Sequence, residues 1–302
     1  VALAGLLCAC TAPPAAAAPT EPRIGVLLVS HGSLSPRWRE MVTEVESRVR
    51  DRILEHGGIA TVRSAFMEYT EPSIASQLEA LDAEGHTDVV IVPLLLTVSG
   101  HSFDDIPAIA GERNDVVTLE RLASEGIRVY RPRAAVHRTP LIDFAGLLRE
   151  NVRRRVAALS EDPSREGVVL VAYGDETYDA EWTRLLEDLG GHLQTTLGVE
   201  TTTHAWCGHL VHYEPAPTRE AIERVLAVED RALVVPVLVA IDERFQHRII
   251  GGAVASVRET LPESESARIR YRADAILPEP ELDDWVVQIA QTTADGLLRE
   301  GR

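Results

Sequence analysis

Short apolar runs alternate with longer amphipathic stretches through the whole body of the chain. In the first half the apolar runs predict strands at residues 24–30, 60–67, 88–96 and 128–130. The amphipathic stretches between them predict helices at residues 36–56, 73–83, 104–124 and 140–159. Strands that are apolar throughout are typical of a parallel sheet covered by helices on both faces. This half is therefore expected to be a doubly wound α/β unit.

The second half of the chain repeats this order. Its predicted strands are at residues 168–172, 201–205, 232–239 and 269–272, and its predicted helices are at 178–197, 218–226, 248–261 and 281–298. The residues recur as well: GVLLVSHGS opens the first half, GVVLVAYGD opens the second, and Pro72 recurs as Pro215. We therefore expect an internal duplication, with two similar doubly wound parallel-sheet lobes, residues 22–160 and 161–302, and a cleft between them.

The composition is that of a globular protein with an aliphatic core. Of the 302 residues, 45% are hydrophobic and 25% are charged, but only 5% are aromatic. The net charge of −17 argues against a nucleic-acid partner, because binding phosphates requires a basic surface. The chain contains no P-loop and no G-x-G-x-x-G pattern, so no nucleotide cofactor is expected. An anionic small molecule stays compatible with this charge, because arginines can cluster locally.

Residues 1–21 differ from the rest, since an apolar stretch is followed by an Ala/Pro-rich linker. The run Leu7-Cys8-Ala9-Cys10 is similar to a bacterial lipoprotein signal, which predicts export to the cell envelope or periplasm and a lipid anchor at Cys10. The alternative is a wrongly assigned N-terminus, because no basic region precedes the apolar stretch. If both cysteines belong to the signal, Cys207 is the one thiol left and no internal disulfide can form.

Three side chains that bind metals follow predicted strands of the first half. His31 comes directly after the first strand, Glu68 after the second, and His101 shortly after the third. The carboxyl ends of parallel strands lie along one edge of a sheet, where ligands gather. Two neutral imidazoles and a carboxylate suit Co²⁺, Ni²⁺, Fe²⁺ or Zn²⁺ and leave coordination positions open. A histidine in a loop usually has no such role, but the placement of all three favours a metal or acid–base site.

The second half has lost this set of residues. His31 becomes Tyr173 and His101 becomes Arg244 in the matching positions, so one working site is expected. A separate group lies in the segment HAWCGHLVH and consists of His204, Cys207, His209 and His212. Its spacing matches no standard zinc pattern. A polar loop or a wall of the cleft is the favoured interpretation of this group, and a metal contact is the alternative.

The segments VSHGS, FMEYTEPSI and VPLLLTVSGHSFDDIP, in this order, resemble the class II tetrapyrrole chelatases, the family of the sirohydrochlorin cobaltochelatases. The resemblance covers residues 22–300 and implies a chelatase-like fold. It also implies that His31 and His101 are the metal-binding and catalytic histidines, with Glu68 as their acidic partner. Glu71 is expected to cap the helix that follows it. His137 lies where the family often has a histidine, and the sequence leaves open whether it faces the cleft.

The substrate implied by this resemblance is a tetrapyrrole with several carboxylates, which arginines bind well. The binding residues expected on the rim are Arg133 and Arg138 from the first half and Arg244 and His247 from the second. Further cations expected near the same rim are Arg37, Arg39, Arg131 and Arg248. Each of them is otherwise an ordinary solvated surface charge.

The sequence therefore predicts a metal chelatase of cobalamin-type biosynthesis that inserts Co²⁺, or alternatively Fe²⁺ or Ni²⁺, into a sirohydrochlorin-like tetrapyrrole. One alternative is an envelope carrier that binds the metal or the tetrapyrrole without turnover. Another is a structural domain with an inactive site. The sequence leaves the oligomeric state undetermined.

Overall fold

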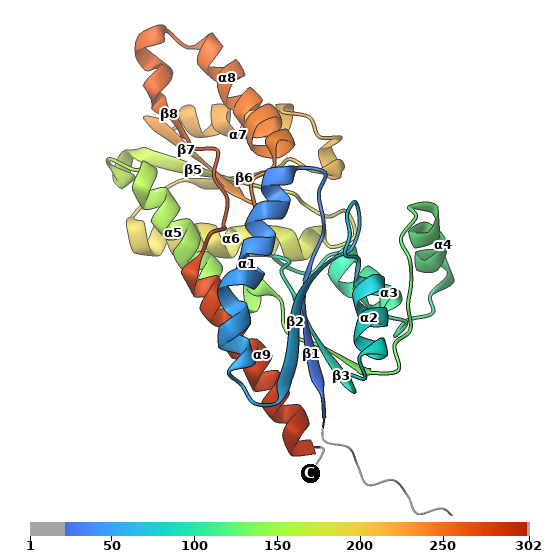
Figure 1. Ribbon diagram of the computed structural model, residues 1–302. Helices are drawn as coiled ribbons and strands as arrows, with labels where there is room; N and C mark the ends of the chain where they lie inside the picture. Colours follow the sequence, from blue (N-terminus) through green and yellow to red (C-terminus); the bar gives the residue numbers. More distant parts are fainter. Residues whose placement is uncertain (1–21, 301–302) are drawn as a thin grey trace, which may run out of the picture.

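The computed structural model describes residues 22–300 and contains two four-stranded parallel sheets (Figure 1). The first sheet has the order β2-β1-β3-β4, formed by β1 (Ile24–Ser30), β2 (Ile59–Phe66), β3 (Asp88–Pro93) and β4 (Ala135–Arg138). The second repeats this topology as β6-β5-β7-β8, formed by β5 (Glu166–Ala172), β6 (Thr202–Trp206), β7 (Arg231–Val237) and β8 (Ile269–Tyr271). The expected duplication of a parallel α/β lobe is confirmed.

Helices cover both faces of each sheet. They are α1 (Pro36–Leu54), α2 (Ile74–Ala83), α3 (Ile106–Ile109), α4 (Val116–Ser124), α5 (Leu147–Leu159), α6 (Asp179–Leu197), α7 (Ala216–Leu226), α8 (Gly251–Thr260) and α9 (Pro280–Glu300). Every residue of β1 is buried. Val26 and Leu28 face one core cluster, and Leu27 and Val29 face another on the opposite side of the sheet. This alternation explains why the strand is apolar on both faces before it ends at Ser30.

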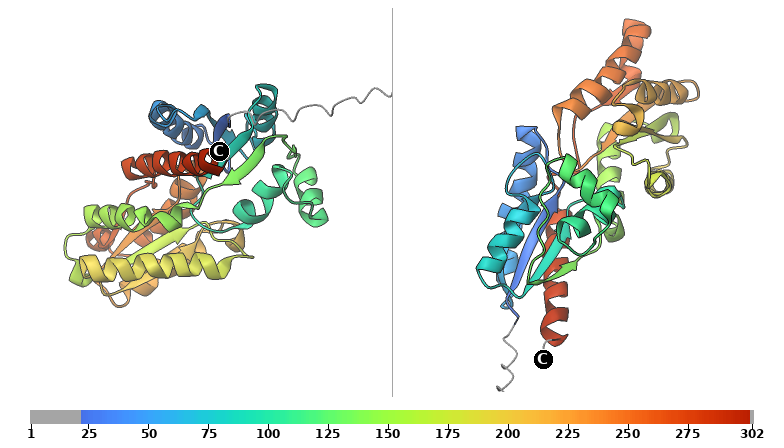
Figure 2. Two further views of the ribbon diagram at one scale, coloured as in Figure 1. Left: turned by 90° about the horizontal axis from the view of Figure 1, so that it is seen from below. Right: turned by 90° about the vertical axis from the view of Figure 1, so that its right-hand side faces the viewer.

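The last helix of each half packs on the sheet of the other half. Figures 1 and 2 show α9 running beside α1 on the first lobe, where Arg48 pairs with Asp283 at 2.6 Å. In return, α5 packs against α6 and β7 of the second lobe. One buried apolar cluster therefore extends through both lobes. The sequence division at residue 160 separates the two sheets. However, α9 of the second half packs on the first lobe, and α5 of the first half packs on the second lobe.

Three expected elements of the first half differ in the structure. The predicted helix at 104–124 is broken into α3 and α4 around Gly111, which has a φ of 70°. The helix predicted from residue 140 begins at Leu147, after Gly146 with a φ of 73°. The strand predicted at 128–130 is wrong. These residues lie in the connection that leads from α4 to β4, and β4 is the fourth strand of the sheet. A glycine in the left-handed region interrupts the first predicted helix at Gly111 and precedes the start of α5 at Gly146. The short edge strand has too little apolar pattern to identify.

Within residues 22–300, no helix is both long enough and apolar enough to cross a membrane. Cys10, the predicted lipid anchor, lies outside the described residues. Cys207 is a buried free thiol in the core of the second lobe.

Candidate metal centre

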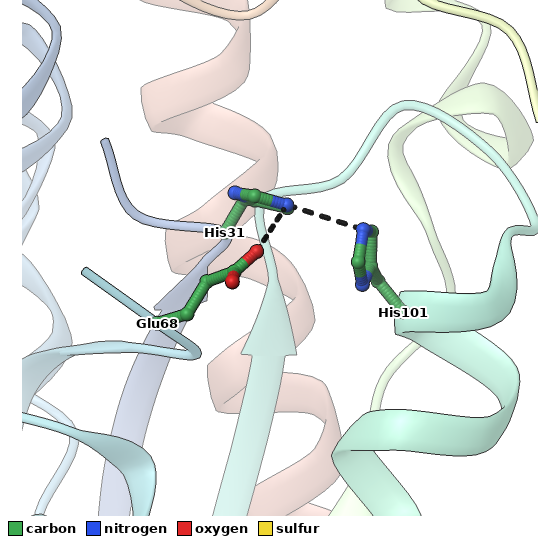
Figure 3. Close-up of side chains that lie close together, drawn as sticks. All are labelled: His31, Glu68 and His101. Atoms are coloured by element: carbon green, nitrogen blue, oxygen red, sulfur yellow. Dashed lines mark hydrogen bonds and ion pairs between the residues drawn. The ribbon is translucent and has the colours of Figure 1, made fainter. Parts of the chain in front are cut away.

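His31, Glu68 and His101 meet at the carboxyl edge of the first sheet (Figure 3). His31 follows β1, Glu68 follows β2, and His101 begins a short π-helix, η1 (His101–Asp105), after β3. One ligand atom from each residue lies within 4.8 Å of the others, and all three side chains are partly buried. Among the described residues this is the one group of three or more His, Cys, Asp and Glu side chains placed to share an ion.

The loops after β1 and β2 are held together through Gly32. The backbone N–H of Glu68 donates to the carbonyl of His31 at 3.1 Å. Gly32 has a φ of 101°, and a Cβ at this position would collide with the carbonyl oxygen of Glu68. A glycine is required here, because the turn is left-handed and the two backbones approach closely. The Ser-His-Gly-Ser sequence therefore brings the imidazole beside the carboxylate.

His101 is oriented by a buried carboxylate one helical turn away. Its Nδ1 lies 2.8 Å from Oδ2 of Asp105, whose side chain is only 2% exposed. Asp105 also pairs with Arg121 of α4. Burial alone would raise the pKa of Asp105, but the hydrogen bond and charge of His101, followed by those of Arg121, lower it overall. The ionised carboxylate of Asp105 thus accepts a hydrogen bond from Nδ1–H of His101, and Nε2 of His101 is left free to bind an ion.

His31 has the same arrangement with a different anchor. Its Nδ1 lies 2.9 Å from the carbonyl oxygen of Gly32, which can only accept a hydrogen bond. Its Nε2 lies 3.1 Å from Nε2 of His101 and 2.9 Å from Oε1 of Glu68. With both Nδ1 atoms protonated, the two Nε2 lone pairs of neutral rings would face each other. This geometry requires a cation between or beside them, either a proton or a metal ion.

The electrostatics of the pair agree with a shared positive charge. Burial by itself lowers the pKa of His31, but the hydrogen bond to Glu68 and the charge of this carboxylate raise it above its ordinary value. Burial likewise raises the pKa of Glu68, and the interactions with His31 and then His101 lower it overall. Glu68 is therefore ionised at neutral pH and stabilises either a protonated His31 or a bound ion.

The donor set fits a first-row divalent metal. Ligand atoms bonded to one ion at about 2.1 Å lie no more than about 4.2 Å apart, and Nε2 of His31 lies 3.1 Å from Nε2 of His101 and 2.9 Å from Oε1 of Glu68. Two nitrogens and one oxygen are borderline ligands suited to Co²⁺, Fe²⁺, Ni²⁺ and Zn²⁺. Three protein ligands leave at least one position open, as an ion that must be handed on requires.

The cations expected on the rim do not all lie there. Arg133 precedes β4, and its backbone N–H donates to Asp82 at the amino-terminal edge of the sheet, so its expected place is wrong. Arg138 ends β4 and pairs with Glu112 at 3.1 Å. Arg244 and His247 are exposed in the short π-helix η5 (Glu243–Ile250), which follows β7 in the second lobe. Their roles in binding stay predictions.

The open questions about Glu71 and His137 have structural answers. The carboxylate of Glu71 accepts from the N–H of Ser73 and the hydroxyl of Ser76, at the start of α2, which confirms its capping role. Nε2 of His137 lies 2.9 Å from Asp88, at the beginning of β3. His137 is therefore a hydrogen-bond partner of Asp88 and does not belong to the group around His31.

The histidine- and cysteine-rich segment of the second lobe does not assemble into a group that could share an ion. Cys207 is fully buried, which raises the pKa of its thiol, and it packs in the apolar core. The ring of His204 lies 4.9 Å from that of Trp206, and His209 lies 5.6 Å from Tyr173. The interpretation as a polar loop is therefore wrong for Cys207, and a place for this segment on the wall of a cleft stays a prediction.

Sequence reasoning missed the residues that orient the site and join the lobes. Asp105 is four positions after His101 in a helical turn, and this spacing could have identified it. The contacts between the lobes could not be predicted, because their partners are far apart in the sequence. The hydroxyl of Ser33 donates to Asp242 at 2.7 Å, and the N–H of Gly100 donates to Asp175 at 3.1 Å. The loops that carry His31 and His101 are thus both tied to strand-end loops of the second lobe.

Comparison with known proteins found similarity over one half and over the whole fold. The family model described as CbiX matches residues 25–159. The sirohydrochlorin cobaltochelatase of Methanosarcina barkeri is 33% identical over 99 residues, which are 32% of this chain and 73% of that protein. The protein of the same name from Saccharolobus solfataricus is 31% identical over 102 residues, or 34% of this chain and 75% of that protein.

Among solved structures, the sirohydrochlorin chelatase SirB from Bacillus subtilis subspecies spizizenii, in complex with cobalt, superposes with a TM-score of 0.64 and 20% identity. The match covers 90% of this chain and 96% of SirB. The structure of CbiX, described as the terminal enzyme of sirohaem biosynthesis in denitrifying bacteria, matches with a TM-score of 0.54 and 16% identity over 89% of this chain and 98% of that one. These two likenesses concern the fold, and they extend over both lobes.

Proposed function

The chain belongs to the CbiX family of sirohydrochlorin cobaltochelatases, and from this premise we propose that it inserts Co²⁺ into a sirohydrochlorin-like tetrapyrrole through His31, Glu68 and His101. The observation that carries the proposal is the convergence of these three ligands within 4.8 Å, inside the segment that the family model matches. Fe²⁺ and Ni²⁺ fit the same ligand set and are the alternative substrates.

The three residues would hold the ion before transfer. Nε2 of His31, Nε2 of His101 and one oxygen of Glu68 are the ligands, because both Nδ1 atoms are occupied by hydrogen bonds. The open positions on the ion are where nitrogens of the macrocycle would enter. Fixed imidazoles keep the ion near the carboxyl edge without enclosing it, which favours release to the substrate.

Proton balance gives the histidines a second role. Insertion of a divalent ion into a neutral tetrapyrrole releases two pyrrole protons. As the ion passes to the macrocycle, each Nε2 regains its lone pair, so the two imidazoles are able to accept the two protons. Glu68, at 2.9 Å from His31, then stabilises the imidazolium that forms. No nucleotide or redox step enters this sequence of events.

The carboxylates of the substrate need cationic partners outside the metal site. Arg244 and His247 are supported in this role by their exposure on the second lobe, and Arg138 by its place at the end of β4. Arginine binds carboxylates through two parallel hydrogen bonds. A small number of such contacts is compatible with the negative net charge of the whole chain.

Location is a separate proposal that rests on residues 1–21. The Leu7–Cys10 pattern supports export and a lipid anchor at Cys10. Expression with radiolabelled palmitate tests it. Label should enter the wild-type protein and be absent from Cys10→Ala, and equal labelling of the two proteins would refute the anchor.

The function is tested by following the absorption spectrum of sirohydrochlorin with Co²⁺ at a large molar excess of both over protein. We expect many equivalents of cobalt product per protein, and a loss of at least about 100-fold in rate for His31→Ala and His101→Ala. His137→Ala is the matched control, because His137 pairs with Asp88 away from the site. Product limited to one equivalent would instead favour a carrier without turnover.

A further inference from the structure

The loops after β1 and β3, which carry the two histidines of the metal centre, are each held by an aspartate of the second lobe. After β1, the hydroxyl of Ser33 donates to Oδ2 of Asp242 at 2.7 Å. After β3, the backbone N–H of Gly100 donates to Oδ2 of Asp175 at 3.1 Å. Ser33 lies two residues after its histidine, and Gly100 directly precedes the other histidine. Both contacts therefore lie next to the metal centre.

The internal duplication relates these two contacts to each other. Asp175 in GVVLVAYGD matches Ser33 in GVLLVSHGS. Asp242 matches Ser99, because each lies six residues after the matching proline of its strand, β7 or β3. In both halves, the loop after the first strand thus contacts the loop after the third strand of the other half. The half without the metal histidines supplies an aspartate as the acceptor in both contacts.

Each carboxylate is fixed within the second lobe by its other oxygen. Oδ1 of Asp175 accepts from the N–H groups of Thr177 and Tyr178 at 2.9 and 3.0 Å. Oδ1 of Asp242 accepts from the N–H of Arg244 at 2.9 Å. The strands that precede the two aspartates, β5 and β7, are hydrogen-bonded neighbours in one sheet. The separation of the two aspartates is therefore determined by the second lobe alone.

The loop after β5 also contacts the π-helix η1, which begins at His101. The ring of Tyr178 lies 6.1 Å from that of Phe103 in an edge-on arrangement, a favourable geometry for two aromatic rings. Together with the hydrogen bond from Gly100 to Asp175, this packing holds the start of η1 against the second lobe. The place of His101 relative to the first sheet therefore depends in part on the second lobe.

The separation of the two histidine rings decides whether both can bind one ion. Nε2 of His31 lies 3.1 Å from Nε2 of His101. Two nitrogens bound to one ion at about 2.1 Å lie no more than about 4.2 Å apart, so a displacement of one loop by more than about 1 Å would take one ring off the ion. We propose that Asp175 and Asp242 are positioning residues, which hold the two loops at the separation that lets both rings bind the ion. This inference rests on the proposed function, because it requires the ion at these rings.

The two contacts should respond differently when an amide replaces the carboxylate. The N–H of Gly100 can only donate, and an asparagine has one acceptor oxygen where Asp175 uses two, so Asp175→Asn loses either this contact or its own anchoring. The hydroxyl of Ser33 can also accept, so the amide NH2 in Asp242→Asn can keep the contact. In isothermal titration calorimetry without tetrapyrrole, we expect Co²⁺ affinity to fall about tenfold in Asp175→Asn and Asp242→Ala, and to stay within about threefold of the wild type in Asp242→Asn.

Ser33→Ala removes the same contact from the side of the first lobe and leaves Asp242 anchored to Arg244. It should lower Co²⁺ affinity about tenfold. The double variant with Asp242→Ala should bind no more than about twofold more weakly than either single variant, because both substitutions remove one contact. The visible absorption of the bound Co²⁺ depends on the geometry of its ligands and should change in these variants, whereas a loss of stability alone would leave it unchanged.

Asp188→Ala is the matched control for a general loosening between the two halves. Asp188 of α6 pairs with Arg149 of α5 at 2.6 Å, so this contact also joins the halves, but it lies between helices and not between strand-end loops. The Co²⁺ affinity of this variant should stay within about twofold of that of the wild type.

The outcomes separate this proposal from the function on which it rests. If the wild type binds Co²⁺, and Asp175→Asn, Ser33→Ala and Asp242→Ala all bind it within about twofold of the wild type, the positioning role is refuted and the metal centre stands. A wild type that binds no Co²⁺ would refute the proposed function, and the positioning role would fail with it.

Discussion

His31 and His101 each use one ring nitrogen as an anchor and leave the other for a cation. The anchors differ: the carbonyl of Gly32 for His31, and the carboxylate of Asp105 for His101. A buried, ionised carboxylate makes the imidazole more basic and fixes its orientation. The metal affinity of the site is therefore expected to depend on Asp105, which is not itself a ligand.

Asp105→Asn tests this dependence. The substitution removes the negative charge behind His101 and leaves Arg121 without its buried partner. We expect Co²⁺ affinity, measured by isothermal titration calorimetry, to fall about 10–100-fold. Asp104→Asn, on the same turn but paired with Arg113, is the control and should bind Co²⁺ like the wild type. Equal Co²⁺ affinities for Asp105→Asn and the wild type would show that Asp105 does not support metal binding by His101.

The raised pKa of His31 determines how metal binding depends on pH. The ion needs the unprotonated ring, so protons compete with Co²⁺ below this pKa. The apparent affinity should rise about tenfold per pH unit up to the pKa, which lies above the ordinary value of about 6.5, and then level off. Glu68→Gln removes the main interaction that raises the pKa, so its profile should level off at a lower pH. Isothermal titration calorimetry with Co²⁺ across a pH series measures both profiles. Coincident profiles for the wild type and Glu68→Gln would contradict the role given to Glu68.

At the scale of elements, the turn between β1 and α1 leaves no room for a side chain at Gly32. At Gly32 the chain turns after β1, and its backbone lies directly against the carbonyl oxygen of Glu68. The helix that follows is capped by Ser35, whose hydroxyl accepts from the N–H of Trp38 at 3.4 Å. A strand, a tight left-handed turn and a capped helix thus place His31, and the contacts of this loop with Glu68 and Asp242 hold it there.

Gly32→Ala should disrupt this turn. Its Cβ would collide with the Glu68 backbone, and alanine is strained at a φ of 101°. We expect a loss of about 2–4 kcal/mol in the free energy of unfolding by urea, together with loss of Co²⁺ binding. Gly57→Ala, where a Cβ meets no atom within 4 Å, should change stability by less than about 0.5 kcal/mol. Similar stabilities for the two variants would contradict the role given to Gly32.

Local pattern was sufficient to predict much of the fold and the position of the site. The apolar run of β1 has the predicted bounds, and the strand-end rule brings His31, Glu68 and His101 to one edge. Local pattern failed where the answer depends on distant packing. The edge strand β4 and the opposite placement of Arg133 follow from pairing with β3, which no window of sequence contains.

At the scale of the molecule, the exchange of α5 and α9 makes each lobe incomplete alone. The buried face of α5, which includes Val152, packs into the core shared by the two lobes, and α9 covers the first sheet beside α1. The Methanosarcina barkeri relative is shorter than half of this chain. In the duplicated protein, α5 and α9 hold equivalent places, so a half could complete itself with the α5 of a second copy.

A fragment of residues 22–160 should therefore form a dimer. Light scattering after gel filtration should give twice the fragment mass, with helical circular dichroism retained. Val152→Asp in the same fragment places a charge on the buried face of α5 and should abolish the dimer. A folded monomer of the unmodified fragment would mean that the exchanged helices are not needed for each lobe.

The most direct test of the shared ion is X-ray absorption at the cobalt K-edge, on full-length protein loaded with one equivalent of Co²⁺ near pH 8. The fine structure should contain the outer-shell scattering of two imidazoles, with one imidazole lost in His31→Ala and one lost in His101→Ala. A cobalt environment that is unchanged by both substitutions would contradict the account, because the ion would then lie elsewhere.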